Sequence, residues 1–161
     1  MGDSLDVTFY GVRGSTPCPC DENRRYGGNT SCVVIDVPGG EPILLDLGTG
    51  LRFYGVAEPC TEVPFRGTAL LSHLHWDHTG GLAALLGLRA QTNSPPRLRI
   101  YGPPGTKEMV AGLLASMVPG ATAGYGVPGA PKTDLNELAE VFELRDKAGV
   151  ELAGMTVTVR R

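Results

Sequence analysis

The sequence contains no long hydrophobic run, and this absence excludes a membrane-spanning protein. No apolar stretch approaches the roughly 18 residues that a membrane-spanning helix needs. The first residues, MGDSLD, contain neither the basic region nor the apolar region of a secretory signal peptide. We therefore expect a cytoplasmic protein with no membrane partner.

Positive charge is also in short supply. The 14 Lys and Arg residues stand against 17 Asp and Glu residues, which gives a formal net charge of -3 and a pI near 5.6. This balance argues against a surface that binds nucleic acid broadly, because such surfaces carry an excess of basic residues. A small phosphodiester remains compatible with it, since a bound metal ion supplies positive charge locally.

Cysteine is scarce, and its spacing is not that of a typical structural metal site. The four cysteines are Cys18, Cys20, Cys32 and Cys60. The Cys-Pro-Cys sequence at 18–20 suggests either a structural zinc site or a redox pair, but no second closely spaced pair accompanies it. We expect reduced thiols of a cytosolic protein, with Cys32 packed at the head of an apolar strand.

The remaining composition is that of an ordinary globular protein. Hydrophobic residues make up 42% and charged residues 19% of the sequence. A length of 161 residues is enough to bury a sizeable core. The 23 Gly and 13 Pro residues predict many loops without reaching the low-complexity range. We expect residues 1–161 to form a single domain.

Hydrophobic periodicity predicts strands that alternate with helices, which is typical of one face of an α/β layered domain. Proline and glycine at 119–120 are expected to end the last helix, before a flexible loop over residues 119–131. The second and third strands read as a hairpin. The expected strands are 5–10, 31–37, 42–46, 68–71, 98–101 and 155–159; the expected helices are 51–56, 79–88 and 106–118; and a short helix enters a strand within 135–144.

All three histidines of the chain lie in one stretch, residues 72–78, with the sequence SHLHWDH. His73, His75, Asp77 and His78 combine imidazoles and a carboxylate at the density of a metal site. In an extended segment His73, His75 and Asp77 project to one side, and His78 can turn toward a second point. Two neighbouring metal ions fit this arrangement, which we place on a loop between a strand end and a helix start. The alternative is a loop of solvated polar residues.

Two earlier segments also carry polar groups. Asp46 closes an apolar strand, where a buried carboxylate needs a partner, although it also suits a cap or turn former for the glycines that follow. The loop GVRGSTP at residues 11–17 offers the cation of Arg13 and the hydroxyl of Ser15. Its alternative is a tight turn with a solvated arginine.

Four motifs together resemble the metallo-β-lactamase-fold hydrolases. One is the His-x-His-x-Asp-His pattern at 73–78, behind a buried strand. The others are GVRGSTP at 11–17, RYGGNTSC at 25–32 and LDLGTGL at 45–51. Together they are similar to the branch that holds ribonuclease Z-like and cyclic-nucleotide-phosphodiesterase-like proteins, and the resemblance extends over nearly the whole chain.

The resemblance implies an αβ/βα sandwich and a metal-dependent hydrolase. It implies two Zn²⁺ ions in a complete site, with Mn²⁺ or Fe²⁺ as alternatives, and a small phosphodiester or an RNA-type substrate. The residues that would bind this substrate are Arg13, Ser15 and Asn29.

The resemblance also assigns roles around the metal ions. His73 and His75 would bind the first ion, and Asp77 and His78 the second. Asp77 would also be catalytic, because it would orient the attacking water. Asp46 would orient a ligand histidine without binding a metal ion itself.

One departure from the family pattern concerns the later strands. The family's site is completed there by two histidines and an aspartate, whereas this sequence has no histidine after His78. Asp134 and Asp146 lie in stretches that do not resemble those strands. We therefore expect a fold and a site that are incomplete at the C-terminus, with weak zinc binding and association with a second copy through uncovered apolar surface.

Two alternatives to a phosphodiesterase-like hydrolase stay open. The first is a non-catalytic metal-binding or interaction module derived from such an enzyme. The second is another hydrolase chemistry on the same fold, such as thioester or β-lactam hydrolysis, because a fold does not fix a function.

Overall fold

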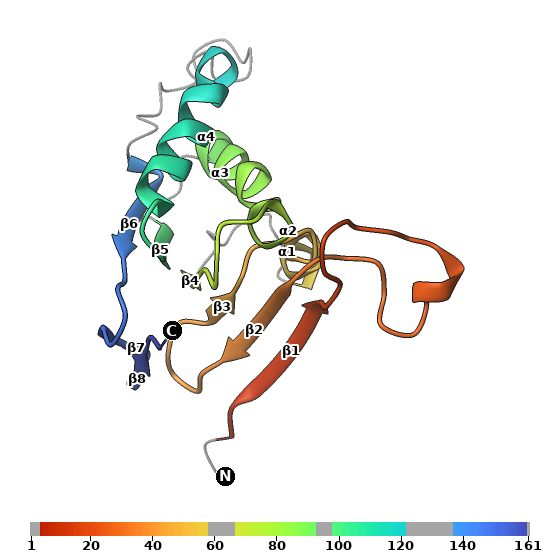
Figure 1. Cartoon of the computed structure of the whole chain (residues 1–161), viewed down its shortest axis with the longest axis horizontal. Coiled ribbons are helices and arrows are strands. Elements are labelled where there is room, and N and C mark those ends of the chain that lie inside the picture. The colour runs from red at the N-terminus through yellow and green to blue at the C-terminus, as the bar shows by residue number, and fades with distance from the viewer. Residues whose placement is uncertain (1–3, 58–66, 93–97, 122–136, 161) are drawn as a thin grey trace.

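The computed structural model describes residues 4–57, 67–92, 98–121 and 137–160 (Figure 1). A six-stranded sheet, with helices against one face, makes up most of these residues. No helix among them is long and apolar enough to cross a membrane. In chain order the elements are β1 Asp6–Gly11, the 3-10 helix η1 Asp21–Asn23, β2 Cys32–Asp36, β3 Ile43–Leu45, α1 Leu51–Ala57, β4 Thr68–Leu70, α2 Trp76–Thr79, α3 Leu82–Thr92, β5 Leu98–Gly102, α4 Thr106–Ala121, β6 Ala139–Glu143, β7 Gly149–Leu152 and β8 Met155–Thr158.

The sheet joins an antiparallel half to a parallel half. Its strand order is β1-β2-β3-β4-β5-β6. The pairs β1/β2 and β2/β3 are antiparallel, whereas β3, β4, β5 and β6 pair in parallel. Parallel neighbours need crossover connections, and helices α1, α3 and α4 lie in these connections. The carboxyl ends of β3, β4 and β5 therefore meet at one edge of the sheet, which is where α/β proteins commonly place functional groups.

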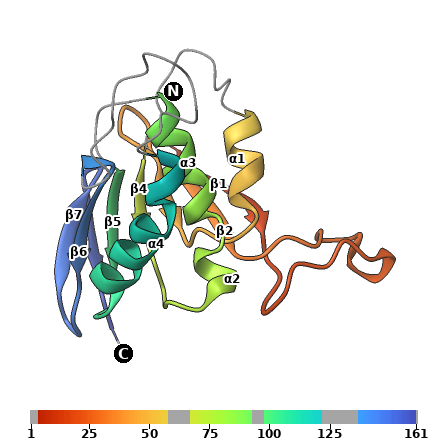
Figure 2. The ribbon, with the colours of Figure 1, turned by 90° about the horizontal axis from the view of Figure 1, so that it is seen from above.

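One face of the sheet packs against the helices. Leu44, Ala69 and Ile100 occupy matching positions on β3, β4 and β5, and each has no solvent exposure. Figure 2 shows α3 and α4 side by side over these strands. Leu82 and Leu86 of α3 belong to the same buried cluster. Full burial of one such leucine contributes about 1.5–3 kcal/mol, so this face supplies most of the core.

The intervening strand residues point to the opposite face. There Ile43 and Tyr101 are buried together with Leu152, which comes from the hairpin of β7 and β8. The Tyr101 ring stacks on Phe142, with 4.6 Å between ring centroids. A small second layer therefore covers part of this face.

The strands and helices expected from periodicity are largely confirmed. Each expected strand overlaps an observed one, and β2 and β3 form the expected hairpin. The expected stop at Pro119 was wrong, because α4 continues to Ala121. A proline in the last turn removes only one intrahelical hydrogen bond, so the helix ends two residues later rather than before it. Strand β7 was missed, since its apolar alternation is only four residues long. The expected loop at 119–131 lies largely outside the described residues.

An apolar stripe on β1 remains exposed. Val7 and Phe9 lie on this strand and Leu5 directly before it, and the exposed fractions of Leu5, Val7 and Phe9 are 49%, 51% and 66%. Val7 lies opposite Ile35 on β2. Opposed residues of an antiparallel pair project to the same face, and Ile35 packs toward the hairpin side of the sheet. The stripe therefore lies on the same face of the sheet as the β7/β8 hairpin, beyond the part that this hairpin covers.

We expect this stripe to make the chain self-associate, because contiguous exposed apolar surface next to an edge strand recruits other chains. Phe9→Thr keeps a strand-forming residue but removes the most exposed ring of the stripe. The variant should show less light scattering than the wild type at equal concentration.

Tyr26→Thr is the matched control, because Tyr26 is equally exposed, at 69%, but lies in the loop after η1. It should scatter like the wild type. A monodisperse wild-type monomer, or the same reduction in both variants, would contradict the expected role of the stripe.

Candidate metal centre

The histidine stretch begins where β4 ends, at the carboxyl edge of the parallel strands. β4 ends at Leu70, which lies opposite Leu45 at the end of β3. Asp46, the residue after β3, and Ser72, which follows β4, are therefore neighbours although 26 positions separate them in the sequence. Sheet register brings the two polar segments together.

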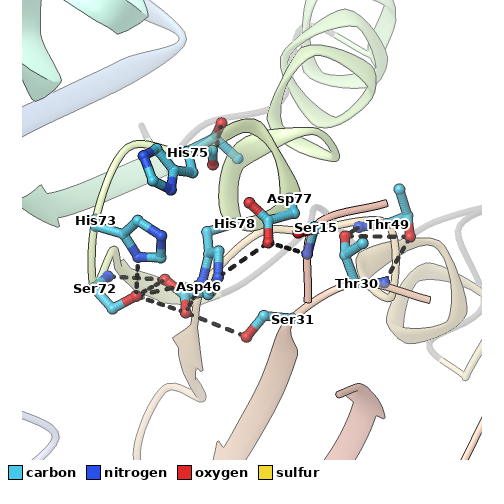
Figure 3. Close-up of polar contacts among 11 residues, drawn as sticks. Ser15, Thr30, Ser31, Asp46, Thr49, Ser72, His73, His75, Asp77 and His78 are labelled. Atoms are coloured by element: carbon cyan, nitrogen blue, oxygen red, sulfur yellow. Dashed lines mark hydrogen bonds and ion pairs between the residues drawn. The ribbon is translucent and has the colours of Figure 1, made fainter. Parts of the chain in front are cut away.

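His73, Asp77 and His78 converge into one cluster (Figure 3). One ligand atom from each lies within 4.8 Å of the others. The ring of His75 lies next to this cluster, with its centroid 4.7 Å from that of His73, and its side chain is exposed. Among the described residues this is the one group of three or more such side chains close enough to hold a metal ion.

The local backbone differs from the expected extended segment. Residues 76–79 form a short helix, α2, which carries Asp77 and His78, and His75 is its N-cap. The expectation that His73, His75 and Asp77 project to one side by strand alternation was therefore wrong. The expected loop between a strand end and a helix start is confirmed for His73 and His75, which precede α2.

Asp46 is the buried group that holds His78. Its carboxylate lies 2.6 Å from Nδ1 of His78 and accepts hydrogen bonds from the backbone and hydroxyl of Ser72 and from the hydroxyl of Ser31. Because Asp46 already accepts hydrogen bonds from Ser72 and Ser31, it serves as the acceptor for the Nδ1–H of His78 as well. Nε2 of His78 therefore points away from Asp46 and lies 3.5 Å from Oδ2 of Asp77, so it is the ring nitrogen in position to bind a metal ion.

Asp46 occupies a strained backbone conformation, with φ of 61°. Left-handed φ values are uncommon outside glycine, although aspartate tolerates them better than most residues. They cost on the order of 1–3 kcal/mol and persist where surrounding contacts enforce them. Here the enforcing contacts are those of the carboxylate itself.

Asp77 is buried, and burial alone raises the pKa of a carboxyl group. The backbone N–H of Ser15 donates to Oδ2 at 2.7 Å and acts against this effect. The neighbouring His78 and His73 act in the same direction as Ser15, and the net result is a lowered pKa of Asp77. Asp77 is therefore ionised at neutral pH. A carboxylate with a lowered pKa stays ionised and is available to bind a cation.

The three residues expected to bind substrate lie in loops that flank Asp77. Ser15 reaches Asp77 through its backbone N–H and has a φ of 64°. The guanidinium of Arg13 donates to Thr16 O and to Asn23 Oδ1, so it braces its own loop. Asn29 accepts the backbone N–H of Arg13 through its carbonyl oxygen. The loops are thus tied to each other and to the cluster.

Backbone bonds fasten α2 to the segment after β3. Leu47 N–H donates to His78 O at 2.7 Å, and Gly81 N–H donates to Leu47 O at 2.7 Å. This close approach requires Gly48, because a Cβ atom there would overlap the carbonyl oxygen of Asp77 and the hydroxyl of Thr30. The glycines that the sequence places beside the motif are therefore packing requirements.

Sequence reasoning missed two serines. Ser72 and Ser31 both donate to Asp46, and Ser72 Oγ also lies 3.1 Å from Nδ1 of His73. Serine directly before a histidine stretch is a weak signal without knowledge of the register that places it beside Asp46. Trp76 is 53% exposed beside the cluster.

The donor set suits a divalent metal ion. Two imidazoles and one ionised carboxylate are ligands that zinc accepts, and three protein ligands with an open position are typical of catalytic zinc. Manganese and iron bind the same ligand types. The buried contact between Asp46 and His78 is the support that metal-binding histidines normally have.

The geometry agrees with comparisons to known proteins. A family model described as the metallo-beta-lactamase superfamily matches residues 25–153, which include Asp46 and the histidine stretch. The chain belongs to the metallo-β-lactamase superfamily. The expected family and α/β fold class are therefore confirmed.

Curated relatives of this superfamily member are named ribonuclease Z. The protein of that name from Mycobacterium sp. (strain KMS) is 32% identical over 159 residues, which covers 96% of this chain and 51% of the relative. The one from Clostridium perfringens is 32% identical over 117 residues, covering 70% of this chain and 33% of the relative. The chain thus spans about half the length of the mycobacterial relatives it matches.

Two solved structures are similar to the chain. The metallo-beta-lactamase fold protein YhfI from Bacillus subtilis matches with a TM-score of 0.65 and 20% identity, covering 97% of this chain and 52% of that one. The short form of human tRNase Z matches with a TM-score of 0.56 and 26% identity, covering 85% of this chain and 43% of that one. The first match supports the fold alone.

The contact at Gly48 gives a test of how α2 is held. Gly48→Ala should destabilise the protein by about 1–3 kcal/mol, because the added methyl forces the α2 backbone to shift. Gly112 is exposed on α4, and a Cβ atom added there would have no neighbouring atom within 4 Å. Gly112→Ala should instead stabilise the protein by roughly 0.5–1 kcal/mol through helix propensity. Thermal unfolding followed by circular dichroism measures both. Shifts of the same sign in the two variants would contradict the close approach.

Proposed function

We propose that this chain is part of a metal-dependent hydrolase that acts on phosphodiesters, with zinc as its metal ion and RNA as a substrate class. The observation that carries the proposal is the convergence of His73, Asp77 and His78, together with the contact from Asp46 that orients the ring of His78. The names of the ribonuclease Z relatives support the choice of phosphodiesters.

Within this proposal each clustered residue has a defined task. His73, Asp77 and His78 would hold one metal ion, in place of the expected division into His73 with His75 and Asp77 with His78. The neighbouring His75 would then be left for a second ion. A bound divalent ion supplies Lewis acidity, which activates water and offsets charge on phosphate oxygens. Asp77 is the proposed catalytic residue, because it is ionised at neutral pH and can orient a water molecule by accepting its hydrogen bond.

The substrate is proposed to lie against the loops that hold Asp77. Arg13, Ser15 and Asn29 come from two segments on this side of the cluster, and the Ser15 N–H already contacts Asp77. To bind a phosphate, the Arg13 guanidinium must exchange its contact with Thr16 or Asn23 for one with the substrate. A planar guanidinium is suited to this exchange because it binds phosphate through two parallel hydrogen bonds.

The donor count implies that the described residues do not hold two metal ions tightly. A catalytic zinc normally has about three protein ligands, and the cluster supplies three in total. Asp146 is exposed in the turn between β6 and β7, and Asp134 lies outside the described residues. We therefore propose a site that is incomplete in this chain.

The single domain, the cytoplasmic location and the pairing with a second copy likewise remain predictions.

The same donor count favours one alternative, a non-catalytic metal-binding module. Such a module needs to bind one ion and another molecule but not to turn over a substrate. The two functions differ in whether the metal-loaded chain accelerates hydrolysis at all.

Zinc binding provides the first test. Loss of a residue that supports a metal ligand typically weakens metal binding by roughly 10–100-fold. Asp77→Ala removes a proposed ligand itself, so it should weaken zinc binding by at least this factor. Asp36→Ala is the matched control, because Asp36 is an exposed carboxylate on β2. Its affinity should equal that of the wild type. Titration against a chromophoric chelator measures the three proteins, and equal affinities would place the metal ion elsewhere.

Hydrolysis provides the second test. The zinc-loaded chain is assayed with bis(p-nitrophenyl) phosphate and with a thioester. We expect slow turnover of the phosphodiester that exceeds that of the thioester, disappears in Asp77→Ala and persists in Asp36→Ala. Faster thioester turnover would indicate the other hydrolase chemistry, and zinc binding without any turnover would indicate the non-catalytic module.

A further inference from the structure

Cys18 and Cys20 form a close pair of thiols in the loop between β1 and β2. Their Sγ atoms lie 2.7 Å apart, and both side chains are partly exposed. Pro19 between them fixes one backbone dihedral angle, which limits how far the two thiols can separate. Formation of a disulfide bond, with an S–S length of roughly 2.05 Å, requires an approach of only about 0.7 Å.

The two thiols differ in acidity. The hydrogen bond between the two Sγ atoms is the main cause that lowers the pKa of Cys18, and the positive charge of Arg13 acts in the same direction. The same contact raises the pKa of Cys20, and a hydrogen bond with Glu22 raises it further. The thiolate is the nucleophilic form of cysteine. We therefore assign the first nucleophilic attack to Cys18 and the second to Cys20.

Cys32 shows the opposite environment. It has no solvent exposure, and burial raises the pKa of its thiol to about 12. A buried neutral thiol is chemically inert. The contrast within one chain indicates that reactivity is confined to the Cys18 and Cys20 pair among the described cysteines.

We propose that Cys18 and Cys20 are a thiol–disulfide exchange site that reacts with low-molecular-weight disulfides. The Cys18 thiolate attacks one sulfur of a disulfide RSSR, forms a Cys18–SR bond and releases RS⁻. The Cys20 sulfur then attacks Cys18 Sγ, gives up its proton, and displaces the second RS⁻ as the Cys18–SR bond breaks. The two thiolates take up the two protons of the dithiol, so the chain loses two electrons and RSSR becomes two RSH.

The disulfide formed in this way is reversible by nature. It would close between residues two apart, so it constrains little of the unfolded chain. Exposed disulfides are also the labile ones, which cycle with the surrounding thiol pool.

The pair is connected to the loop beside the metal centre through one side chain. The Asn23 amide donates to Cys20 Sγ at 3.0 Å, and its oxygen accepts from Arg13 Nη1 at 3.2 Å. Closure of the ring moves Cys20 Sγ and removes its proton. The change therefore reaches the Arg13 guanidinium through Asn23, in the same loop whose Ser15 contacts Asp77.

The test uses the full chain carrying Cys60→Ser, which leaves Cys18, Cys20 and Cys32. It is incubated at neutral pH with oxidised glutathione, quenched with acid, alkylated and mapped by mass spectrometry. The expected product lacks two hydrogen atoms, carries no glutathione, and has Cys18 joined to Cys20. Cys32 should stay reduced, and it becomes available to alkylation only after unfolding.

Two variants separate the steps. Cys20→Ser should stop at a stable glutathione adduct on Cys18, because the second attack is removed. Cys18→Ser should react more slowly, since the hydrogen bond with Glu22 still raises the pKa of the remaining thiol. Equal rates in the two variants, a lasting glutathione adduct on the parent chain, or modification of native Cys32 at the rate of Cys18 would each overturn the proposal.

Discussion

The buried carboxylate of Asp46 is the interaction on which the metal centre depends. A charge removed from water is costly unless hydrogen bonds replace its hydration. Asp46 meets this requirement with donors from Ser31, Ser72 and His78, which come from the start of β2, the segment after β4 and helix α2. Satisfying one carboxylate therefore fixes three segments that are distant in sequence. The orientation of His78, and with it the cluster, follows from this electrostatic requirement.

Backbone strain is concentrated at the same place. Asp46 and Ser15 are two of the four non-glycine residues with positive φ in the described chain, and each contacts a member of the cluster. Left-handed backbone persists when surrounding contacts over-determine it. The strain at Asp46 aims its carboxylate at His78, and the strain at Ser15 aims an N–H at Asp77. Local preference is thus overridden at the residues that orient potential ligands.

Sequence patterns predicted the sheet better than the site. Strand alternation depends on which residues are buried, and burial of Leu44 and Ile100 follows directly from the apolar pattern. The density of imidazoles predicted where a metal site would lie. The pattern did not predict the helical turn of α2, because Leu47 imposes it from another segment by donating to His78 O and accepting from Gly81 N–H. Ser31 and Ser72 were missed for the same reason, since only strand register brings them to Asp46.

The loop after β1 links the two kinds of chemistry in this chain. Its Ser15 lowers the pKa of the Asp77 carboxyl, and its Arg13 lowers the pKa of the Cys18 thiol. The backbone bond between Arg13 N–H and Asn29 O fixes this loop against the next one, so neither residue moves independently of its neighbours. A hydrogen bond or a positive charge stabilises whichever anion lies beside it, a carboxylate or a thiolate. One short polar loop therefore contributes to the ionisation of both a candidate metal ligand and a candidate redox thiol.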